Sequence, residues 1–239
     1  MTLTSSRVVV VGGTSGIGFA TARAALDAGA EVLVASAKQS SVDRALGQLP
    51  SGASGRALDV SDISAVEAFF TDIGKLDHLV YTAGEALALM PLAELDVDQA
   101  RSFFQTRYFG ALSVVRAAAP HIRAGGSITL TTGVASARPR PGWSVGASVC
   151  GAVEALTRAL AVELAPVRVN AVSPGVVRSP LWAGMAEVER EQMYRGMAES
   201  LPVGHVGETE EIAHAYLYCM TQTFATGTVL TVDGGAVLV

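Results

Sequence analysis

The amino-acid sequence predicts an α/β fold, a doubly wound and mostly parallel sheet of seven strands with helices on both faces. Short β-branched segments alternate with longer Ala- and Leu-rich segments along the whole chain. This alternation is typical of parallel sheets, because a helix must return the chain before the next parallel strand begins. The run Val8–Val11 is continuously apolar, which predicts a strand buried on both faces.

The remaining elements follow from the same alternation. The predicted strands are residues 8–11, 31–35, 56–60, 76–81, 127–132, 168–172 and 229–232. The predicted helices are residues 16–28, 42–49, 61–73, 98–122 and 145–164, and residues 180–220 are expected to be mostly helical. Ser61 is the expected N-cap of the third helix, and a glycine or proline follows each of the first three helices. The Ser- and Gly-rich residues 50–55 and the Pro-rich residues 138–142 are expected to be surface loops.

The composition of the chain excludes several classes of protein. Half of the 239 residues are apolar, 16% are charged, and the net charge is −5. This acidic balance, with no basic block, gives no support for nucleic-acid binding. The N-terminal residues do not resemble a signal peptide, and no uninterrupted apolar stretch is long enough to span a bilayer. We therefore expect a soluble cytoplasmic protein that does not act at a membrane.

The turn that leaves the first strand is rich in glycine. The segment V-V-V-V-G-G-T-S-G-I-G joins this strand directly to the first helix and spaces Gly12, Gly16 and Gly18 as G-x3-G-x-G. Glycines let the backbone turn sharply and approach a pyrophosphate, and the free amides and dipole of a helix start bind phosphate charge. A glycine-rich turn without a ligand is the alternative. The position between a strand and a helix is the context that a Rossmann dinucleotide site requires.

The end of the second strand distinguishes between the two nicotinamide cofactors. An acidic residue there binds the ribose hydroxyls of NAD and repels the 2′-phosphate of NADP. The sequence reads Val34-Ala35-Ser36-Ala37-Lys38 at this point and has no carboxylate. Ser36 is suited to donate to a 2′-phosphate and Lys38 to neutralise it, although Lys38 is also explained as a solvated loop residue. These residues favour NADP(H) over NAD(H).

Further motifs are spread along the chain. They are Asp59-Val60, Ala83-Gly84, Arg168-Val169-Asn170, Pro174-Gly175 and Thr231-Val232-Asp233-Gly234-Gly235. With the glycine loop, they make the chain resemble the short-chain dehydrogenase/reductase family from end to end, and its length is usual for that family. The resemblance implies that Asp59 and Val60 contact the adenine and that residues 174–179 surround the nicotinamide. The expected cofactor-binding residues are Gly12, Thr14, Ser15, Gly16, Ile17, Gly18, Ser36, Lys38, Asp59, Val60, Ala83, Gly84, Pro174, Gly175, Val177 and Ser179.

The catalytic half departs from the family pattern. The family uses a serine, a tyrosine thirteen residues later, a lysine four residues after that, and an asparagine on the preceding long helix. The corresponding residues here are Gly133, Gly146, Cys150 and Arg107. In the family, the tyrosine exchanges a proton with the substrate oxygen, the lysine lowers the pKa of the tyrosine, and the serine holds the oxygen. Loss of a general acid lowers a rate by roughly 10²–10⁴, and loss of an oxyanion donor by roughly 10²–10³.

Two residues are weak candidates to take over these catalytic roles. Adjacent strand residues point to opposite faces, so one of Thr131 and Thr132 is expected to face the site. Thr132 is the candidate because it adjoins Gly133, although a β-branched residue is also ordinary in a strand. Arg107 is expected either to bind an anionic substrate or polarise an oxygen, or to pair with a carboxylate at a subunit contact.

Other reactive side chains in this region have simpler explanations. Cys150 has no histidine near it in sequence, so we expect a packed thiol and not a nucleophile. Cys150 and Cys219 also lack metal-ligand spacing, and no metal site is predicted. Tyr81 and Tyr108 are phenols in the region that have the chemistry of a proton donor, but neither aligns with the family's tyrosine.

These observations predict a single dinucleotide-binding domain over residues 1–239, with a substrate lid at about residues 180–205 and Trp143 and Trp182 on the substrate side. The expected function is an NADP(H)-dependent oxidoreductase that acts on a carbonyl, alcohol or related small molecule through an atypical acid/base site. The alternatives are a catalytically inactive NADP(H)-binding sensor or partner subunit, and a dehydratase or isomerase in the same cleft. Association through the two long helices and residues 236–239, as in relatives, implies a homodimer or homotetramer.

Overall fold

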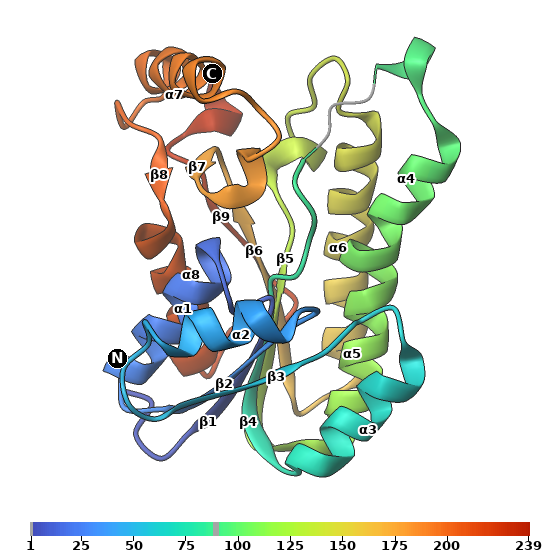
Figure 1. The fold of residues 1–239 in the computed structure, drawn as a ribbon, viewed down its shortest axis with the longest axis vertical. Helices are drawn as coiled ribbons and strands as arrows, with labels where there is room; N and C mark the ends of the chain where they lie inside the picture. The colour runs from blue at the N-terminus through green and yellow to red at the C-terminus, as the bar shows by residue number, and fades with distance from the viewer. Residues whose placement is uncertain (1, 88–90) are drawn as a thin grey trace.

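The structure is a computed structural model that describes residues 2–87 and 91–239 (Figure 1). The strands of its main sheet are β1 (Arg7–Val11), β2 (Glu31–Ser36), β3 (Ala53–Ala57), β4 (Leu76–Tyr81), β5 (Ile122–Thr131), β6 (Arg168–Pro174) and β9 (Val229–Val232). The helices are α1 (Gly16–Asp27), α2 (Gln39–Leu46), α3 (Ile63–Ile73), α4 (Val97–Phe104), α5 (Ala111–Ala118), α6 (Ser144–Glu163), α7 (Glu187–Ser200) and α8 (Thr209–Thr221). A π-helix, η2 (Gln105–Gly110), joins α4 to α5.

The main sheet has seven strands in the order β3-β2-β1-β4-β5-β6-β9, and every neighbouring pair is parallel. From β1, successive strands are added towards the β3 edge of the sheet, and from β4 they are added towards the β9 edge. The strand order therefore reverses between β1 and β4, which is where open α/β sheets bind ligands. The predicted doubly wound Rossmann sheet is confirmed. A second, two-stranded sheet of β7 (Val177–Arg178) and β8 (Gly207–Glu208) was not predicted.

The two faces of the main sheet are covered by different helices. Val9 and Val11 of β1 pack in a cluster with residues of α3, α5 and α6, whereas Val8 and Val10 pack with residues of α1 and α8. Each of these four valines is at most 1% exposed, which explains the unbroken apolar run in β1. Figure 1 shows α1, α2 and α8 on one side of the sheet and α3, α5 and α6 on the other.

The third strand lies earlier in the sequence than the predicted residues 56–60. β3 pairs with β2 from Ala53 to Ala57, so part of the predicted loop 50–55 belongs to the sheet. Glycine is a poor strand former. At Gly55, however, the close packing of α2 on the strand requires a residue without a side chain. A Cβ added to Gly55 would lie 2.5 Å from Cγ1 of Val42, so the glycine lets α2 pack closely on the strand. Asp59 and Val60 consequently lie beyond the carboxyl end of β3, at the ligand-binding edge.

The long helix predicted for residues 98–122 is three consecutive segments, α4, η2 and α5, and it ends at Ala118. β5 then begins at Ile122, before the predicted start at residue 127. Apolar spacing did not predict the π-helix, because a single wider turn hardly changes the pattern.

The predicted starts of two other helices also differ. α2 spans Gln39–Leu46 and not residues 42–49. Asp62 caps α3 in place of Ser61, because its carboxylate accepts a hydrogen bond from the Ala65 amide.

α6 is the helix of the described residues with the length and composition of a membrane span, at 20 residues and a mean hydropathy of 1.4 in its best window. Its buried residues are Val145, Val149, Val153, Thr157 and Leu160, spaced three or four apart on one face. Val153 and Leu160 pack in a cluster with residues of β5 and β6, and Val145 and Val149 pack with Phe103 of α4. A helix in the core of a domain has the same composition, so this feature is weak evidence for a span.

Candidate active site

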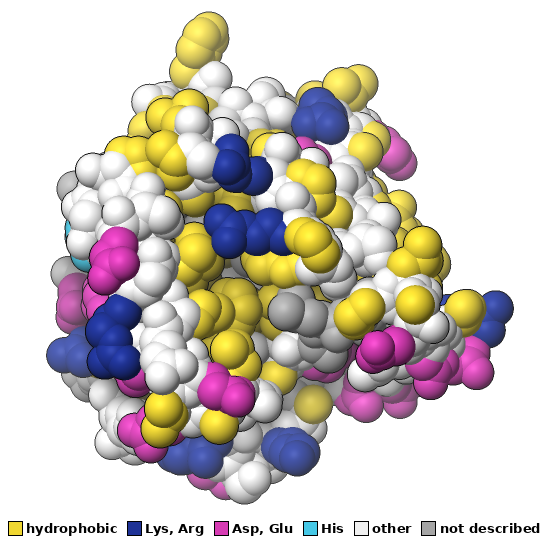
Figure 2. Space-filling view, turned by 90° about the horizontal axis from the view of Figure 1, so that it is seen from above, with side chains coloured by type: hydrophobic (Ala, Val, Ile, Leu, Met, Phe, Trp, Pro, Cys, Tyr) yellow, Lys and Arg dark blue, Asp and Glu magenta, His cyan; other side chains and the backbone are white. Residues whose placement is uncertain are grey.

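A cleft opens at the carboxyl ends of β1, β4, β5 and β6, beside the point where the strand order reverses. Its volume is about 580 Å³. The view from above shows hydrophobic side chains gathered around a hollow on this face (Figure 2). All of the expected cofactor-binding residues except Lys38 line the cleft. The two candidates for catalysis, Thr132 and Arg107, line it as well, and so do the residues at the family's usual catalytic positions, Gly133, Gly146 and Cys150.

The glycine loop at one end of the cleft brings two backbone segments into close contact. Gly12 has a φ of +87°, and a Cβ there would lie 2.5 Å from the Ala83 nitrogen. A Cβ on Gly18 would lie 2.3 Å from the Gly12 carbonyl oxygen. No side chain caps the start of α1, where Ser15 is extended. The loop therefore fits a pyrophosphate, which requires close backbone approach and unsatisfied helix-start amides.

No carboxylate lies where the cleft meets the end of β2, in the part of the chain that the structure describes. Ser36 is the last residue of β2 and lines the cleft, whereas Lys38 is an exposed residue at the start of α2. Asp59 is nearby, but its carboxylate accepts hydrogen bonds from the Ser61 amide at 2.9 Å and the Ser61 hydroxyl at 2.7 Å. These two bonds lower the pKa of Asp59. Asp59 is thus an ionised residue that is engaged with its own loop.

Small residues leave space at the opposite end of the cleft. A Cβ added to Gly146 meets no atom within 4 Å, and one added to Gly133 lies 3.4 Å from the Cys150 sulfur. Burial raises the pKa of the Cys150 thiol, and the neighbouring Thr132 hydroxyl and Arg107 charge oppose this only in part. Cys150 is therefore a protonated thiol at neutral pH, in agreement with the expected packed residue.

Thr131, the last residue of β5, and Thr132, which follows it, both line the cleft, although only one was expected to face it. The Thr131 hydroxyl is 2.6 Å from both the Tyr81 carbonyl oxygen and the Tyr216 hydroxyl. The Thr132 hydroxyl donates to the Cys150 carbonyl at 3.0 Å. Side-chain alternation fails at this point because β5 ends at Thr131, so Thr132 no longer follows the pleat. Both hydroxyls bond to other protein groups.

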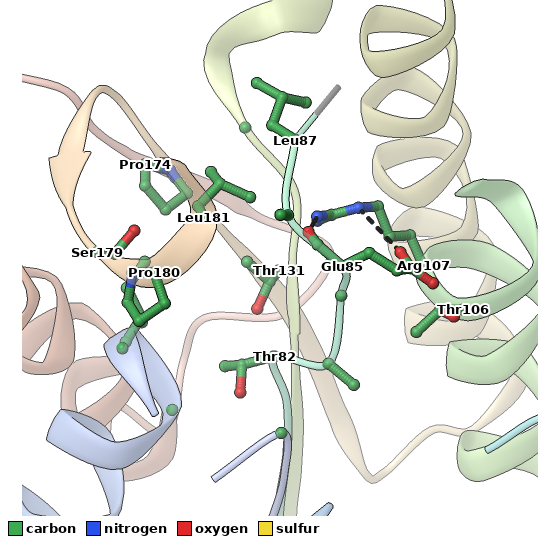
Figure 3. A pocket seen from close by; sticks show the side chains of 18 of the residues that line it. Thr82, Glu85, Leu87, Thr106, Arg107, Thr131, Pro174, Ser179, Pro180 and Leu181 are labelled. Carbon is green, nitrogen blue, oxygen red and sulfur yellow. Dashed lines mark hydrogen bonds and ion pairs between the residues drawn. The ribbon is translucent and has the colours of Figure 1, made fainter. Parts of the chain in front are cut away.

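Arg107 extends from η2 into the cleft, between Glu85 and the apolar side chains of Leu87 and Leu181 (Figure 3). Its Nη2 donates to the Glu85 carbonyl, and its Nε lies 3.8 Å from the Glu85 carboxylate. The guanidinium carbon is 4.5 Å from the centre of the Phe103 ring. The ion-pair partner of Arg107 is thus a residue of the same chain.

The guanidinium of Arg107 is a largely buried cation with donors to spare. The side chain is 22% exposed, and its buried Nε has no hydrogen-bond partner among the described residues. Nη1 lies beside Gly84, where an added Cβ would be 2.6 Å away. Burial lowers the pKa of Arg107, the Glu85 carboxylate opposes this, and arginine stays charged in proteins. Such a group is suited to bind an anion or to polarise an oxygen.

Neither phenol near the site is available to a ligand in the cleft. Tyr81 is 2% exposed, does not line the cleft, and donates its hydroxyl to the Thr106 carbonyl. Burial raises the pKa of this phenol, so it is a poor acid. Tyr108 packs against the hydrophobic core and does not line the cleft either. The interpretation of these residues as proton donors is therefore wrong, because β4 directs Tyr81 towards η2.

An apolar rim surrounds the end of the cleft near Arg107. It consists of Leu87, Phe103, Trp143, Val149, Leu181 and Trp182. Trp143 and Trp182 were predicted from the sequence, whereas the other rim residues and Glu85 were not predicted as site residues. Most of the missed residues lie in turns or at helix ends, where no periodic pattern marks them.

The expected lid, residues 180–205, contains the short helix η5 (Pro180–Trp182) and α7. Pro180, Leu181 and Trp182 line the cleft. Arg178 connects α7 to β7, since its Nη1 lies 2.8 and 2.9 Å from the two Glu191 carboxylate oxygens. The guanidinium also lies 4.4 Å from the centre of the Tyr194 ring.

Comparison with known proteins assigns this fold and cleft to one family. The family model described as an SDR-like Rossmann domain matches residues 1–239. The chain therefore belongs to the short-chain dehydrogenase/reductase family, which confirms the predicted class of NAD(P)-dependent oxidoreductases.

Similar proteins cover nearly the whole chain. The chain is 38% identical to the short-chain dehydrogenase/reductase ucsE of Acremonium sp, over 97% of this chain and 95% of that protein. A small-chain dehydrogenase solved in complex with NADPH is 36% identical, with a TM-score of 0.84 over 98% of this chain and 100% of that one. A short-chain oxidoreductase from Pseudomonas aeruginosa PAO1, solved with NADPH and containing an atypical catalytic center, is 29% identical, with a TM-score of 0.88 over 96% of each chain.

Proposed function

We propose that this chain is an NADP(H)-dependent oxidoreductase that acts on a small carbonyl or alcohol substrate through an atypical acid/base site. The observation that carries this proposal is one continuous cleft that runs from the glycine loop to Arg107. The glycine end fits a pyrophosphate, and the Arg107 end is largely apolar, which suits an organic substrate. A bound nicotinamide cofactor supplies or accepts a hydride in such a site.

The chain's own residues divide the binding of the cofactor between them. The glycine loop and the start of α1 hold the pyrophosphate, Asp59 and Val60 flank the adenine, and residues 174–179 flank the nicotinamide. Ser36 donates a hydrogen bond to the 2′-phosphate of NADP(H), and Lys38 lies nearby in sequence. No carboxylate of the described residues at the end of β2 repels the negative charge of this phosphate. The two NADPH-bound relatives support the same choice of cofactor.

Arg107 is the group that acts on the substrate oxygen in this proposal. Its charge and unsatisfied donors lie at the cleft end that carries Gly133, Gly146 and Cys150. Thr132 is a weaker candidate, because its hydroxyl already donates to the Cys150 carbonyl. Residues 180–205 form the lid over this end.

In this proposal, the protein assembles as a homodimer or homotetramer. Exposed apolar residues that suit such an interface lie on α4, η2 and α6 and at the C-terminus, namely Val97, Phe109, Val162 and Leu238. A symmetric assembly of this kind buries the same surface on each subunit.

Two measurements test the proposal. Isothermal calorimetry should show that NADPH binds more tightly than NADH, and that Ser36→Asp reverses this preference because a carboxylate repels the 2′-phosphate. The absorbance of NADPH should then fall in the presence of a ketone, an enone or a quinone. Tight NADPH binding without oxidation by any acceptor would contradict the oxidoreductase and would favour a sensor or partner subunit.

A further inference from the structure

The cleft end near Arg107 has no ordinary proton donor. The residues that line the whole cleft, within the described ranges 2–87 and 91–239, include no histidine, tyrosine or lysine. The titratable residues on the Arg107 side are Glu85, Cys150 and Arg107 itself. Glu85 forms an ion pair with Arg107, and burial raises the pKa of Cys150. The Cys150 thiol is therefore a weaker acid than a free thiol, and a substrate here meets a buried cation with no stronger acid beside it among the described residues.

This combination discriminates between two kinds of hydride acceptor. Hydride addition to an isolated ketone produces a localised alkoxide, a strong base that requires a proton from the enzyme in the same step. Hydride addition to a conjugated carbonyl compound produces a delocalised enolate or hydroquinone anion, which is a much weaker base. A preorganised cation stabilises that charge without proton transfer, and water can protonate the product later.

Arg107 is held in the position that this role requires. The Phe103 ring lies under the guanidinium, and the Glu85 carbonyl binds Nη2, so the side chain is fixed on two sides. Nη1 has no hydrogen-bond partner among the described residues and lies beside Gly84, in the turn after β4. The apolar rim favours a hydrophobic acceptor over a sugar or other polyol.

We infer that the acceptor is a hydrophobic α,β-unsaturated carbonyl compound, quinones included, whose oxygen binds Arg107 while the hydride adds to the conjugated system. This inference rests on the proposed function and names its substrate class. The C–H bond at C4 of NADPH breaks and a C–H bond forms on the acceptor, so NADPH becomes NADP⁺. The acceptor becomes an oxyanion paired with Arg107 and takes its proton from water.

The first test compares carvone, which is an enone, with dihydrocarvone, which lacks the conjugated ring double bond. NADPH should be oxidised at least about a hundredfold faster with carvone, the effect of a missing general acid on the isolated ketone. Mass spectrometry and chromatography should identify dihydrocarvone as the product. Equal rates, or carveol as the product, would overturn the inference and leave the proposed function intact. No oxidation with either compound or with menadione would overturn both.

The second test needs no turnover. The absorbance of para-nitrophenolate, a stable oxyanion, is followed as protein is added with NADP⁺ at a pH below the pKa of the phenol. The protein should increase the phenolate signal, Arg107→Leu should abolish the increase, and Arg107→Lys should retain part of it. Arg23→Leu is the matched control, because Arg23 is exposed on α1 and does not line the cleft. An equal signal with Arg107→Leu, when circular dichroism shows it folded, would overturn the inference.

Discussion

The hydroxyl of Tyr81 donates a hydrogen bond of 2.5 Å to the carbonyl of Thr106, the residue before Arg107. Tyr81 is the last residue of β4, and Thr106 lies in the π-helix η2. Gly110 permits this contact, because a Cβ there would lie 2.6 Å from the Tyr81 oxygen. The sheet is thereby connected to the backbone turn that carries the cleft's guanidinium. Tyr81 does not line the cleft, but its hydrogen bond positions the turn that carries Arg107.

Replacement of Tyr81 by phenylalanine should destabilise the protein and disturb Arg107. The partly buried Thr106 carbonyl would lose the hydrogen bond from the phenol, which costs about 1 kcal/mol. Urea unfolding should show this loss, together with weaker binding of para-nitrophenolate. Tyr218→Phe is the control, since Tyr218 is 36% exposed, and its free energy of unfolding should stay within about 0.5 kcal/mol of the unsubstituted protein. Equal stability of the two variants would contradict a role for the Tyr81 hydroxyl.

Gly18→Ala should abolish or strongly weaken NADPH binding. The added methyl would lie 2.3 Å from the Gly12 carbonyl oxygen and 2.3 Å from the Thr82 hydroxyl, so the loop must move. Gly151→Ala in α6 is the matched control, because its Cβ meets no atom within 4 Å. Calorimetry should show unchanged NADPH affinity for the control and at least about a tenfold loss, or about 1.4 kcal/mol, for Gly18→Ala. If both variants bind NADPH with the same affinity, the glycine loop does not hold the cofactor.

The triple substitution Gly133→Ser, Gly146→Tyr and Cys150→Lys should create reduction of isolated ketones. The glycines leave room for the new side chains, and the tyrosine supplies the proton that the alkoxide requires. Reduction of dihydrocarvone should rise by about 10²-fold, whereas a triple variant with phenylalanine at position 146 should show no gain. If the variant with phenylalanine at position 146 shows the same increase in the rate, the tyrosine phenol is not the source of the proton.

The stability of the protein should fall as the pH drops from about 6.5 to about 4, in part because of His78. Burial lowers the pKa of His78 to about 4, and its Nδ1 lies 2.9 Å from the Ser127 hydroxyl. Between these pH values the unfolded chain binds a proton that the folded protein does not, so protonation favours unfolding. The loss from this residue is about 3 kcal/mol, and His78→Asn should remove that part of the pH dependence. Urea unfolding across this pH range measures it, and an identical slope in His78→Asn would contradict the assignment.

The sequence predicted those parts of the molecule whose structure depends on residues close together in the chain. The valines of β1 and the glycines after it mark the strand, the turn and the helix start, and Gly12 and Gly18 are required at their positions. β3 was misplaced because the packing of Gly55 against Val42 involves a helix that comes earlier in the chain. Arg107 was identified as a candidate, but its surroundings were not predicted. They depend on Glu85, Phe103 and the π-helix, which no spacing in the sequence encodes.

The most direct test of the account is a calorimetric titration of the purified protein with NADPH and NADH. We predict saturable binding of both at one site per chain, with NADPH the tighter ligand, and weak or absent binding in Gly18→Ala. Binding of neither nucleotide to protein that is folded by circular dichroism would contradict the claim that this cleft holds a nicotinamide cofactor.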